Sequence, residues 1–437
     1  MERVTVVGGG IAGLTAAYRL RNAGFEVRVL EKNDYPGGRM STETRRTPYG
    51  IFRLDRGAQF IASGYKRLHA LCDELGVADQ IRNVRQTSNA VLKDGKFHSG
   101  DYDRPMVFLR SKLIPWSSKR RLVRLLWDVW RTGVSPLEIT RSAEFDRESM
   151  PEYVVRRLGK PALDYLFGPA LSATFDADPE HFSALFLLSV VRFVLGGFRL
   201  RGFTNGTGAL TEALAERLNV EYGVCVSKVE RTAGGFRVHT SGGVFESERV
   251  VIAVPGTQVL DMVQELITSE EKRFFESVAY CEGIIVYLLL RGEPRHLPFY
   301  GLSFAPSEGI GVYGVAMDHF KAGCVPEGMG LMNGALTQTA ARTLMHASDD
   351  EVVSFFLDEM ARTPVGRLDP FDAAVMRWRP MLPLFYRGYV RRLSDFERRK
   401  PTPGLEFAGD YLVGPYTEAA LVSGLRAAER ILDSVRR

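Results

Sequence analysis

The side chains that could take part in chemistry are concentrated near the end of this sequence, in "GDYLVGPYTEAALVSG" (residues 409–424). This stretch holds the carboxylate of Asp410, the ring of Tyr416 and the start of a helix, expected from about Thr417, whose amides at Ala419 and Ala420 could bind an anion. Elsewhere the seven histidines stand isolated, and no nucleophile–base set, carboxylate pair or metal-ligand spacing stands out. We therefore expect no metal, and chemistry performed by a bound cofactor that the protein orients and shields from water.

Such a cofactor needs a binding element, and "RVTVVGGGIAGLTAAYRLRNAGFEVRVLEK" near the N-terminus has the required pattern. Residues 4–7 predict a buried strand, Gly8, Gly10 and Gly13 form G-x-G-x-x-G, and a helical pattern follows. The first glycine permits a tight turn, the second lets a diphosphate approach the backbone, and the third lets the helix pack closely on the strand. Glu31, eighteen residues after Gly13, ends a second expected strand, where a carboxylate can bind ribose hydroxyls. This order of elements predicts a dinucleotide site.

The following "PGGR", residues 36–39, extends this pattern. Gly38 permits close approach of the backbone to a ligand, and the Arg39 guanidinium could bind a diphosphate through two parallel hydrogen bonds. The alternative is an ordinary loop that carries a surface arginine. Combined with the preceding motif, we interpret Arg39 as part of the cofactor site.

Together these motifs resemble the flavin-containing amine oxidase superfamily, which includes monoamine and polyamine oxidases, protoporphyrinogen oxidase and the carotenoid desaturases. "FRLDRGAQFIASGY" (residues 52–65) resembles the family's segment near the isoalloxazine ring, and residues 407–432 resemble its terminal motif. The resemblance implies FAD as the cofactor, with Asp410 on its ribityl or diphosphate side and the helix after Thr417 aimed at flavin N1 and O2. The cofactor-binding residues implied are Gly8, Gly10, Ala12, Gly13, Glu31, Lys32, Gly38, Arg39, Gly57, Ala58, Gln59, Phe60, Val226, Asp410, Ala419 and Ala420.

The resemblance also implies an α/β fold, with a Rossmann-like FAD-binding domain of the discontinuous GR2 type and an inserted α+β substrate domain. We expect residues 1–80, 200–265 and 372–437 to form the FAD-binding domain. Residues 81–199 and 266–371 would form the substrate domain. Within the latter, residues 85–98 predict a short hairpin that turns at Asp94-Gly95.

On the substrate side, the resemblance places Tyr416 where amine oxidases have one wall of an aromatic cage over the flavin. Phe385, Tyr386 and Tyr389 are candidates for the second wall, and we predict Tyr416, Phe385 and Tyr389 as catalytic-site residues. Many amine oxidases carry a lysine that bonds a water at flavin N5, but Gly283 stands at that position here. No cysteine follows Cys324, which excludes covalent attachment through a cysteine near the cage, so we expect FAD to be bound noncovalently.

Charge and cysteine content narrow the class of protein. The 437 residues carry a net charge of only +5 without a long basic block, so nucleic acid is not predicted. The four cysteines are far apart and form neither a zinc site nor a disulfide pattern. Because no leader precedes the first expected strand, we expect a cytoplasmic protein.

A basic amphipathic helix is expected over residues 117–132, with a serine cap. Its predicted apolar face consists of Leu122, Leu125, Leu126 and Val129, with arginines on the other face. We interpret it as a solvated helix of the substrate domain. The alternative is a weak peripheral contact with a membrane surface.

These features predict an FAD-dependent oxidoreductase that removes hydride from a C–N or C–H bond of an apolar or amine small-molecule substrate, with oxygen or a quinone as acceptor. Tyr416 favours an amine. The absent lysine and residues 146–184 and 376–389, which resemble protoporphyrinogen oxidase-like members, favour C–C dehydrogenation. A non-catalytic protein resembling the GDP-dissociation inhibitors is the alternative from another class, and the intact nucleotide motifs argue against it. The sequence predicts no particular oligomeric state.

Overall fold

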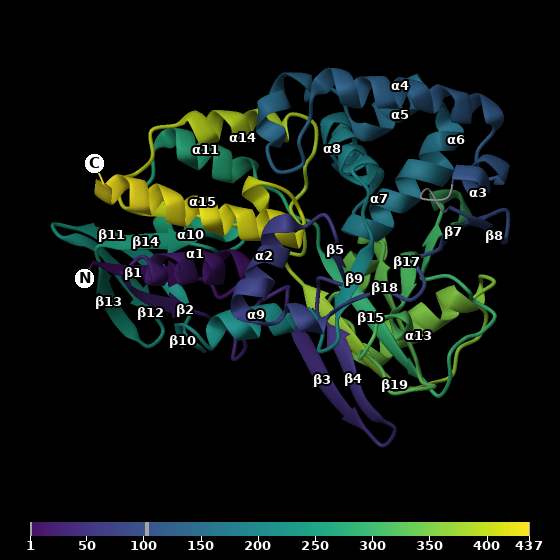
Figure 1. The fold of residues 1–437 in the computed structure, drawn as a ribbon, viewed down its shortest axis with the longest axis horizontal. Coiled ribbons are helices and arrows are strands. Elements are labelled where there is room, and N and C mark those ends of the chain that lie inside the picture. Colours follow the sequence, from purple (N-terminus) through teal and green to yellow (C-terminus); the bar gives the residue numbers. More distant parts are fainter. Residues whose placement is uncertain (1, 101–104, 437) are drawn as a thin grey trace.

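The chain was analysed as a computed structural model, which describes residues 2–100 and 105–436. A parallel five-stranded sheet carries the N-terminal motif (Figure 1). β1 pairs with β2 on one side and with β14 on the other. In spatial order the strands are β10 (Asn219–Glu221), β2 (Glu26–Leu30), β1 (Arg3–Val7), β14 (Arg249–Ile252) and β20 (Leu405–Phe407). The two ends of the chain therefore contribute to one sheet, as a discontinuous domain requires.

Helices α1 (Ile11–Asn22) and α15 (Thr417–Arg436) pack against each other beside this sheet (Figure 1). A Cβ added at Gly424 would lie 2.1 Å from the carbonyl oxygen of Ala12, so the glycine is what allows this close crossing. The expected strand at residues 4–7 and the helix from Thr417 are confirmed. The remaining helices around this part are α2 (Lys66–Leu75), α9 (Gly208–Ala215), α10 (Val259–Val263), α11 (Ser269–Ser277) and α14 (Tyr389–Arg398).

A mixed seven-stranded sheet forms the second large layer. Its strand β15 (Gly283–Leu290) is buried along its whole length between β19 and β18. The expected hairpin is confirmed as β7 and β8, and Asp94 and Gly95 both have positive φ in its turn. In spatial order the sheet consists of β19 (Pro370–Trp378), β15, β18 (Gly330–Leu336), β17 (Val312–Met317), β16 (Gly301–Phe304), β7 (Asn89–Lys93) and β8 (Lys96–Ser99).

Smaller strand groups connect the two large sheets. They are the hairpin β3 (Thr42–Thr47) and β4 (Gly50–Asp55), the group β5 (Ile61–Ala62), β9 (Leu200–Phe203) and β6 (Ile81–Asn83), and the antiparallel β11 (Val226–Thr232), β12 (Gly235–Thr240) and β13 (Gly243–Ser247). Helices α12 (Gln338–Leu344) and α13 (Asp349–Ala361) pack on the seven-stranded sheet.

A helical layer covers the upper side of the seven-stranded sheet in Figure 1. It consists of α3 (Pro105–Arg110), α4 (Trp116–Thr132), α5 (Met150–Leu158), α6 (Lys160–Ala162), α7 (Gly168–Phe175) and α8 (Ala184–Leu195). Among the described helices, none combines the length and the apolar character that crossing a bilayer would require.

Helix α4 corrects two expectations. Pro115, rather than a serine, precedes the helix, and no side chain caps it. Leu125 and Val129 are buried as expected, but Leu126 is exposed. The solvent side is not purely charged, because it also carries large apolar side chains: Trp116, Val123, Trp127 and Trp130. Apolar residues that recur with a period of 3.6 residues identified the helix. This periodicity could not decide which of the two apolar stripes faces the core.

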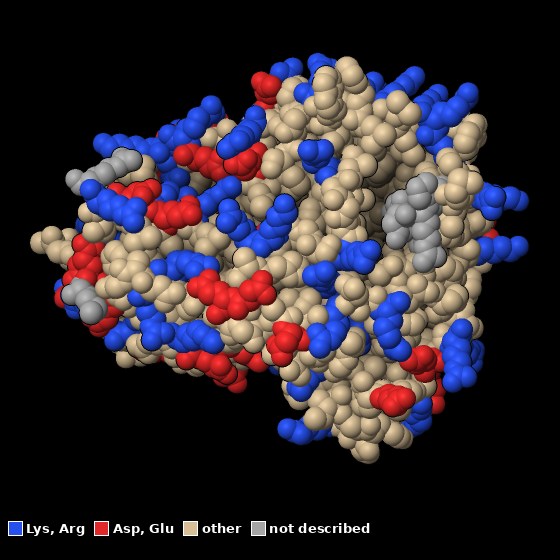
Figure 2. Space-filling view, in the orientation of Figure 1, with Lys and Arg blue, Asp and Glu red and all other residues tan. Residues whose placement is uncertain are grey.

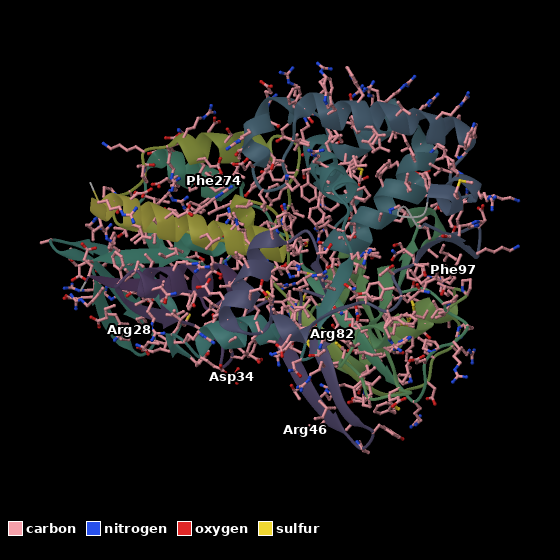
Figure 3. All side chains as sticks on the ribbon, viewed as in Figure 1. Arg28, Asp34, Arg46, Arg82, Phe97 and Phe274 are labelled. Carbon is pink, nitrogen blue, oxygen red and sulfur yellow. The ribbon has the colours of Figure 1, made fainter. Side chains whose placement is uncertain are left out.

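An aromatic core lies among α11, α14 and the segment that leads to α15. Phe274, labelled in Figure 3, stacks on Phe396 at a centroid distance of 4.1 Å, and Tyr389 and Tyr411 lie beside it. All four rings are buried. This cluster anchors α11 and α14 beneath the segment that leads to α15.

Candidate functional site

The glycine loop between β1 and α1 has the geometry that its spacing predicts. Gly8 has φ +106°, and a Cβ there would meet the Ala253 carbonyl oxygen at 2.6 Å. A Cβ at Gly13 would lie 2.1 Å from the Gly8 carbonyl oxygen, so only glycine permits this contact between helix and loop. At Gly10, by contrast, no heavy atom lies within 4 Å of an added Cβ. The open side of the loop is therefore at Gly10, where α1 begins without a side-chain cap.

Glu31 closes the adjacent side of this loop. Its carboxylate accepts a hydrogen bond from the Gly9 amide at 2.6 Å and another from the Asn33 amide at 2.8 Å. The Val224 amide donates to the Glu31 carbonyl at 2.9 Å, which brings buried Val226, at the start of β11, toward the same region. Lys32 is exposed. Each carboxylate oxygen retains a second acceptor position, so Glu31 can still bind a hydroxyl.

Arg39 and Asp410 form an ion pair that joins both ends of the chain. The Arg39 guanidinium lies 2.7 Å from Asp410 Oδ2 and also donates to the carbonyl of Met381. Burial alone would lower the pKa of Arg39, but the Asp410 carboxylate raises it overall. Tyr280, which sequence reasoning missed, donates to Asp410 Oδ1 at 3.0 Å and lies under the guanidinium. The Met381 carbonyl and the Tyr280 hydroxyl thus help to hold the Arg39–Asp410 ion pair in place.

The segment 55–60, predicted to lie near the isoalloxazine ring, begins at a fully buried carboxylate. Asp55 Oδ1 accepts from the Thr42 hydroxyl at 2.7 Å and from the Thr207 amide at 2.8 Å. Gln59 donates to the Asp55 carbonyl at 3.1 Å, and the Tyr287 hydroxyl lies 2.9 Å from its Oε1. Ala58 donates from its amide to the Arg39 carbonyl, Gly57 lies against the same carbonyl, and Phe60 is half-buried.

A buried lysine links this segment to the seven-stranded sheet. Lys321 Nζ lies 2.7 Å from Asp318 and 3.7 Å from Asp55, and its side chain is only 1% exposed. Burial would lower the pKa of Lys321, but these two carboxylates hold it well above the ordinary value. Burial raises the pKa of Asp318 in turn. Lys321 therefore holds the 55–60 segment in place through an ion pair that is buried from solvent.

The start of α15 presents a free amide, as expected. Its first amides precede the intrahelical ladder, and no described group accepts from the Ala419 amide. The Ala420 amide is different, because it donates to the Tyr416 carbonyl at 3.1 Å. Ala419 is therefore the better placed of the two predicted anion-binding amides. The neighbouring Glu418 carboxylate caps α2 instead, accepting from the amides of Arg67 and Leu68 at 2.8 Å each.

The three predicted catalytic-site residues do not come together. The Tyr416 ring stacks on Tyr65 at 5.9 Å and 20°, and its hydroxyl donates to the Pro136 carbonyl at 2.8 Å. Phe385 and Tyr389 are completely buried in the aromatic core instead, and the Tyr389 hydroxyl donates to the Tyr411 carbonyl. The family resemblance suggests these residues as partners of Tyr416. The segment 383–389 instead packs between α8 and α14, and Tyr65 stacks on Tyr416.

Gly283, the first residue of β15, has its side-chain space already filled. A Cβ built there would lie 1.7 Å from the Met381 Sδ atom. The Met381 amide donates to the Cys281 carbonyl at 2.8 Å, and its own carbonyl accepts from Arg39. The neighbouring Trp378 indole donates to the Arg56 carbonyl at 2.6 Å. A longer side chain at position 283 would therefore displace Met381 from beside the Arg39–Asp410 pair.

These observations fit an FAD molecule. Four groups between β1 and α15 could contact it: the open face at Gly10, the free acceptor positions of Glu31, the Arg39 guanidinium and the Ala419 amide. They would suit, respectively, the diphosphate, the adenosine ribose, the diphosphate or ribityl side, and the anionic edge of the flavin. When bound, this cofactor would supply the acceptor for a hydride.

Comparison with known proteins agrees with this description. The family model described as flavin containing amine oxidoreductase matches residues 11–432. The chain belongs to this family, has its α/β FAD-binding fold and is an FAD-dependent oxidoreductase. The reading as a non-catalytic binding protein is therefore set aside.

Two curated relatives and one solved structure illustrate the range of the family. The chain is 25% identical over 458 residues to coproporphyrinogen III oxidase of Mycobacterium leprae (strain TN), covering 99% of this chain and 98% of the relative. It is 29% identical over 185 residues to protoporphyrinogen oxidase 2, chloroplastic/mitochondrial, of Arabidopsis thaliana, covering 42% and 34%. Cyclohexylamine oxidase from Brevibacterium oxydans IH-35A superposes with a TM-score of 0.79 at 18% identity over 100% of both chains.

Proposed function

We propose that this enzyme oxidises a porphyrinogen, a reduced cyclic tetrapyrrole, by dehydrogenation rather than oxidising an amine. Met381 carries this proposal, because its sulfur fills the space over Gly283 where amine oxidases of the family commonly have a lysine. The full-length similarity to a protein named coproporphyrinogen III oxidase supports the same substrate class. The packing of Tyr416 on Tyr65 supports it further, because that ring is already engaged.

In such a reaction a hydride leaves a bridging carbon and a proton leaves a ring nitrogen, and one new double bond forms. When bound, FAD would supply the acceptor for this hydride, with oxygen or a quinone as the final electron acceptor. The protein would keep the reacting carbon in an apolar setting made by Met381 and neighbouring rings. The Ala419 amide and the positive end of α15 would stabilise the negative charge that develops at the flavin edge.

Anaerobic mixing with candidate substrates tests the proposal directly. Coproporphyrinogen III and protoporphyrinogen IX should bleach the flavin absorbance, whereas putrescine and cyclohexylamine should leave it unchanged. Rapid bleaching by an amine without bleaching by either porphyrinogen would overturn the proposal. A Gly283→Lys/Met381→Ala double variant is the matched test of the carrying observation. It should fold better than Gly283→Lys alone, because the space is vacated.

The cofactor assignments also belong to this proposal. We propose noncovalent FAD held by the residues predicted from the sequence, with Ala420 acting through the helix rather than through its own amide. We propose the expected domain division with one boundary moved, because β19 pairs with β15 and so residues 372–378 belong with the substrate domain. All four cysteines are free thiols, which supports a reducing cytoplasm. Because FAD is proposed to be bound noncovalently, denaturation in acid should release all the flavin into solution.

We further propose that the enzyme docks peripherally on an anionic membrane through the outward side of α4, here called the α4 face. This face carries Trp116, Val123, Leu126, Trp127 and Trp130, of which Trp130 is 71% exposed. Trp116, Val123, Trp127 and Trp130 are seven, four and three residues apart, so they lie on one side of the helix, with Leu126 beside them. Exposed apolar stripes of this kind mark interaction surfaces, and tryptophan suits the headgroup region of a bilayer.

Charge complementarity favours an anionic bilayer as the partner. Four exposed arginines flank the α4 face, and Figure 2 shows basic side chains along this upper edge: Arg120, Arg121, Arg124 and Arg131. The one acidic residue of α4, Asp128, is buried and paired with Arg157. The outward side of the helix is thus apolar and cationic, as in helices that lie in a membrane interface.

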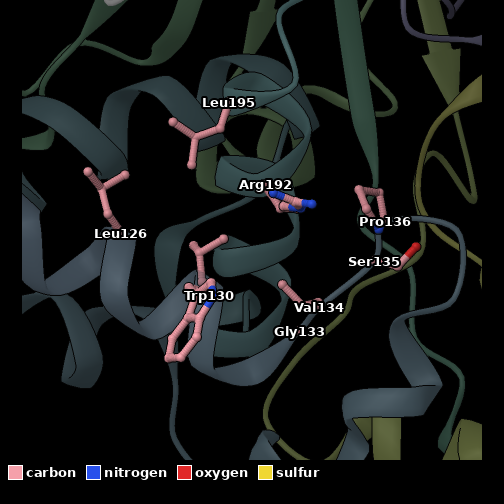
Figure 4. Close-up of a pocket in the computed structure, with 9 residues that line it drawn as sticks. Leu126, Trp130, Gly133, Val134, Ser135, Pro136, Arg192 and Leu195 are labelled. Atoms are coloured by element: carbon pink, nitrogen blue, oxygen red, sulfur yellow. The ribbon is translucent and has the colours of Figure 1, made fainter.

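A pocket of about 310 Å³ opens beside the α4 face, lined by Leu126, Trp130, Pro136, Arg192 and Leu195 among others (Figure 4). Its Pro136 carbonyl is the group that accepts from the Tyr416 hydroxyl. The pocket, on the proposed membrane side, is therefore linked through Pro136 to Tyr416, the residue before α15.

Co-sedimentation with vesicles tests this docking. The holoenzyme should bind phosphatidylglycerol vesicles and not phosphatidylcholine vesicles, and 0.5 M salt should weaken binding. A Trp127→Ser/Trp130→Ser variant should lose at least tenfold in vesicle affinity. Val244→Ser, at an exposed apolar residue on β13, is the matched control and should bind like the wild type. Equal binding by both variants would exclude the α4 face.

A further inference from the structure

Asp176 lies at the end of α7 in a fixed and unusual backbone position. It has φ +50°, and its amide donates to the Ser172 carbonyl at 2.8 Å. Its carbonyl accepts from Gln338 Nε2 at 3.0 Å, and the same nitrogen donates to the Glu282 carbonyl at 2.6 Å. Gln338 therefore ties the end of α7 to the segment that enters β15, next to Gly283.

This position brings the Asp176 carboxyl toward the centre of the site. Cys281 Sγ contacts the carbonyl of Phe175, the residue before Asp176, at 4.0 Å. The Cys281 carbonyl in turn accepts from the amide of Met381, which contacts Gly283 and Arg39. Figure 2 shows a hollow below α4 and α5, in the region that α7 occupies in Figure 1. Asp176 is thus connected through two residues to the ion pair expected to hold the cofactor.

The carboxylate of Asp176 lacks a protein partner. Its residue is half-buried, and within the described part of the chain no side chain or amide donates to it. Burial alone raises the pKa of Asp176 to about 7. Native proteins rarely leave a half-buried carboxylate without a protein donor. This arrangement points to a donor that arrives with a ligand.

The neighbouring titratable groups do not supply that donor. Burial, followed by the charge of Asp176, raises the pKa of Cys281 to about 12. Burial and a bond to Asp178 raise the pKa of Tyr313 far above its ordinary value, and its hydroxyl donates to Asp178 at 2.6 Å. No lysine or arginine of the described chain forms an ion pair with Asp176. The carboxylate therefore faces a region of low polarity.

We infer that Asp176 is a substrate-recognition residue, whose carboxylate accepts hydrogen bonds from the pyrrole N–H groups of a porphyrinogen held beside Met381. The inference rests on the proposed function and adds a residue that binds the nitrogens of the tetrapyrrole ring. A neutral N–H donor suits this apolar place, because a carboxylate can accept from it without burying a second charge. Neither the nucleotide motifs nor the aromatic residues provide such an acceptor for the substrate.

Two variants remove the charge without straining the backbone. Asp176→Asn and Asp176→Gly both tolerate a positive φ, so the holoenzyme should keep its thermal midpoint and flavin content. The dissociation constant for coproporphyrin III, measured by absorbance titration, should rise about tenfold in each. Glu180→Gln, at an exposed carboxylate four residues away, is the matched control and should bind like the wild type.

A pH profile distinguishes recognition from a structural role. The accepting form of Asp176 is ionised, so kcat/KM for coproporphyrinogen III should rise as pH increases through about 7 in the wild type. In Asp176→Asn this rise should disappear, and the loss should fall mainly on KM. A variant that loses affinity through unfolding would instead lose its flavin and lower its thermal midpoint.

The outcomes separate the inference from the proposed function. Unchanged porphyrin affinity in both variants overturns the inference, even where porphyrinogens bleach the flavin. Porphyrin binding that depends on Asp176, without bleaching by any porphyrinogen, overturns the proposed function and keeps the recognition role. A wild type that binds no porphyrin overturns both.

Discussion

The glycine loop and the substrate side of the site differ in what holds them in place. The loop is built from contacts that the backbone makes within residues 8–31, such as Gly13 against the Gly8 carbonyl and the Gly9 amide with the Glu31 carboxylate. The substrate side is built from side chains far apart in sequence, such as Lys321 with Asp55. The loop should therefore fail when a single Cβ is added, whereas the substrate side should fail when one partner of a charged group is removed.

Replacing Gly13 by valine should give the largest effect. The new Cβ would overlap the Gly8 carbonyl, which neither element can relieve, so we expect a loss of more than about 3 kcal/mol in unfolding free energy and no copurifying FAD. Thermal unfolding and flavin absorbance measure both. Gly10→Ala is the matched control, because space is open there: its fold should persist while FAD binding weakens at least tenfold, about 1.4 kcal/mol. Wild-type behaviour of Gly13→Val would contradict the close-contact role.

Replacing Lys321 by methionine should be the most damaging change on the substrate side. It would leave Asp318 and Asp55 buried without their cation, at a cost of about 3–5 kcal/mol in urea unfolding. A second change, Asp318→Asn, should recover part of that loss. The exposed pair of Lys228 and Glu265 is the control, and Lys228→Met should cost less than about 1 kcal/mol. Equal losses at both lysines would show that burial of the cluster is unimportant.

Replacing Asp410 by asparagine should have a smaller effect on stability and a large one on the cofactor. Arg39 is about a quarter exposed, so water screens the unpaired guanidinium and we expect about 2 kcal/mol. FAD affinity, measured by fluorescence titration of the apoprotein, should fall because the guanidinium loses its orientation. Glu246→Gln, in an exposed pair with Arg237, should leave both quantities unchanged. Full FAD affinity in Asp410→Asn would remove the ion pair from the cofactor site.

Replacing Tyr416 by phenylalanine should give the smallest effect. It removes only the hydrogen bond to the Pro136 carbonyl, worth about 1 kcal/mol, and keeps the ring on Tyr65. Tyr416→Ala should cost more and alter turnover if the ring faces the substrate. Equal kinetic losses in Tyr416→Phe and Tyr416→Ala would assign the role to the hydroxyl instead.

The sequence predicted the parts whose physical causes are local. The strand before Gly8, the turn at Asp94-Gly95 and the helix from Thr417 depend on spacing and turn residues, and all three are confirmed. Tyr280, Met381 and Lys321 left no such signal, because each acts on a partner brought near by folding. "FDAD" around Asp176 contained the acid, but nothing in the letters indicated that it lacks a donor. The outward tryptophans of α4 were missed because helical periodicity does not identify the core side.

Strands β1 and β20 come from opposite ends of the chain and lie in one sheet, and helices α1 and α15 pack together beside it. This arrangement has a consequence for biosynthesis. Arg39 and Asp410, separated by 371 positions, meet only after nearly the whole chain has left the ribosome. The growing chain therefore carries a glycine loop and an arginine that have no closing partner for most of its synthesis. Capture of the cofactor is consequently a late event, and a chain that ends before α15 would be released without it.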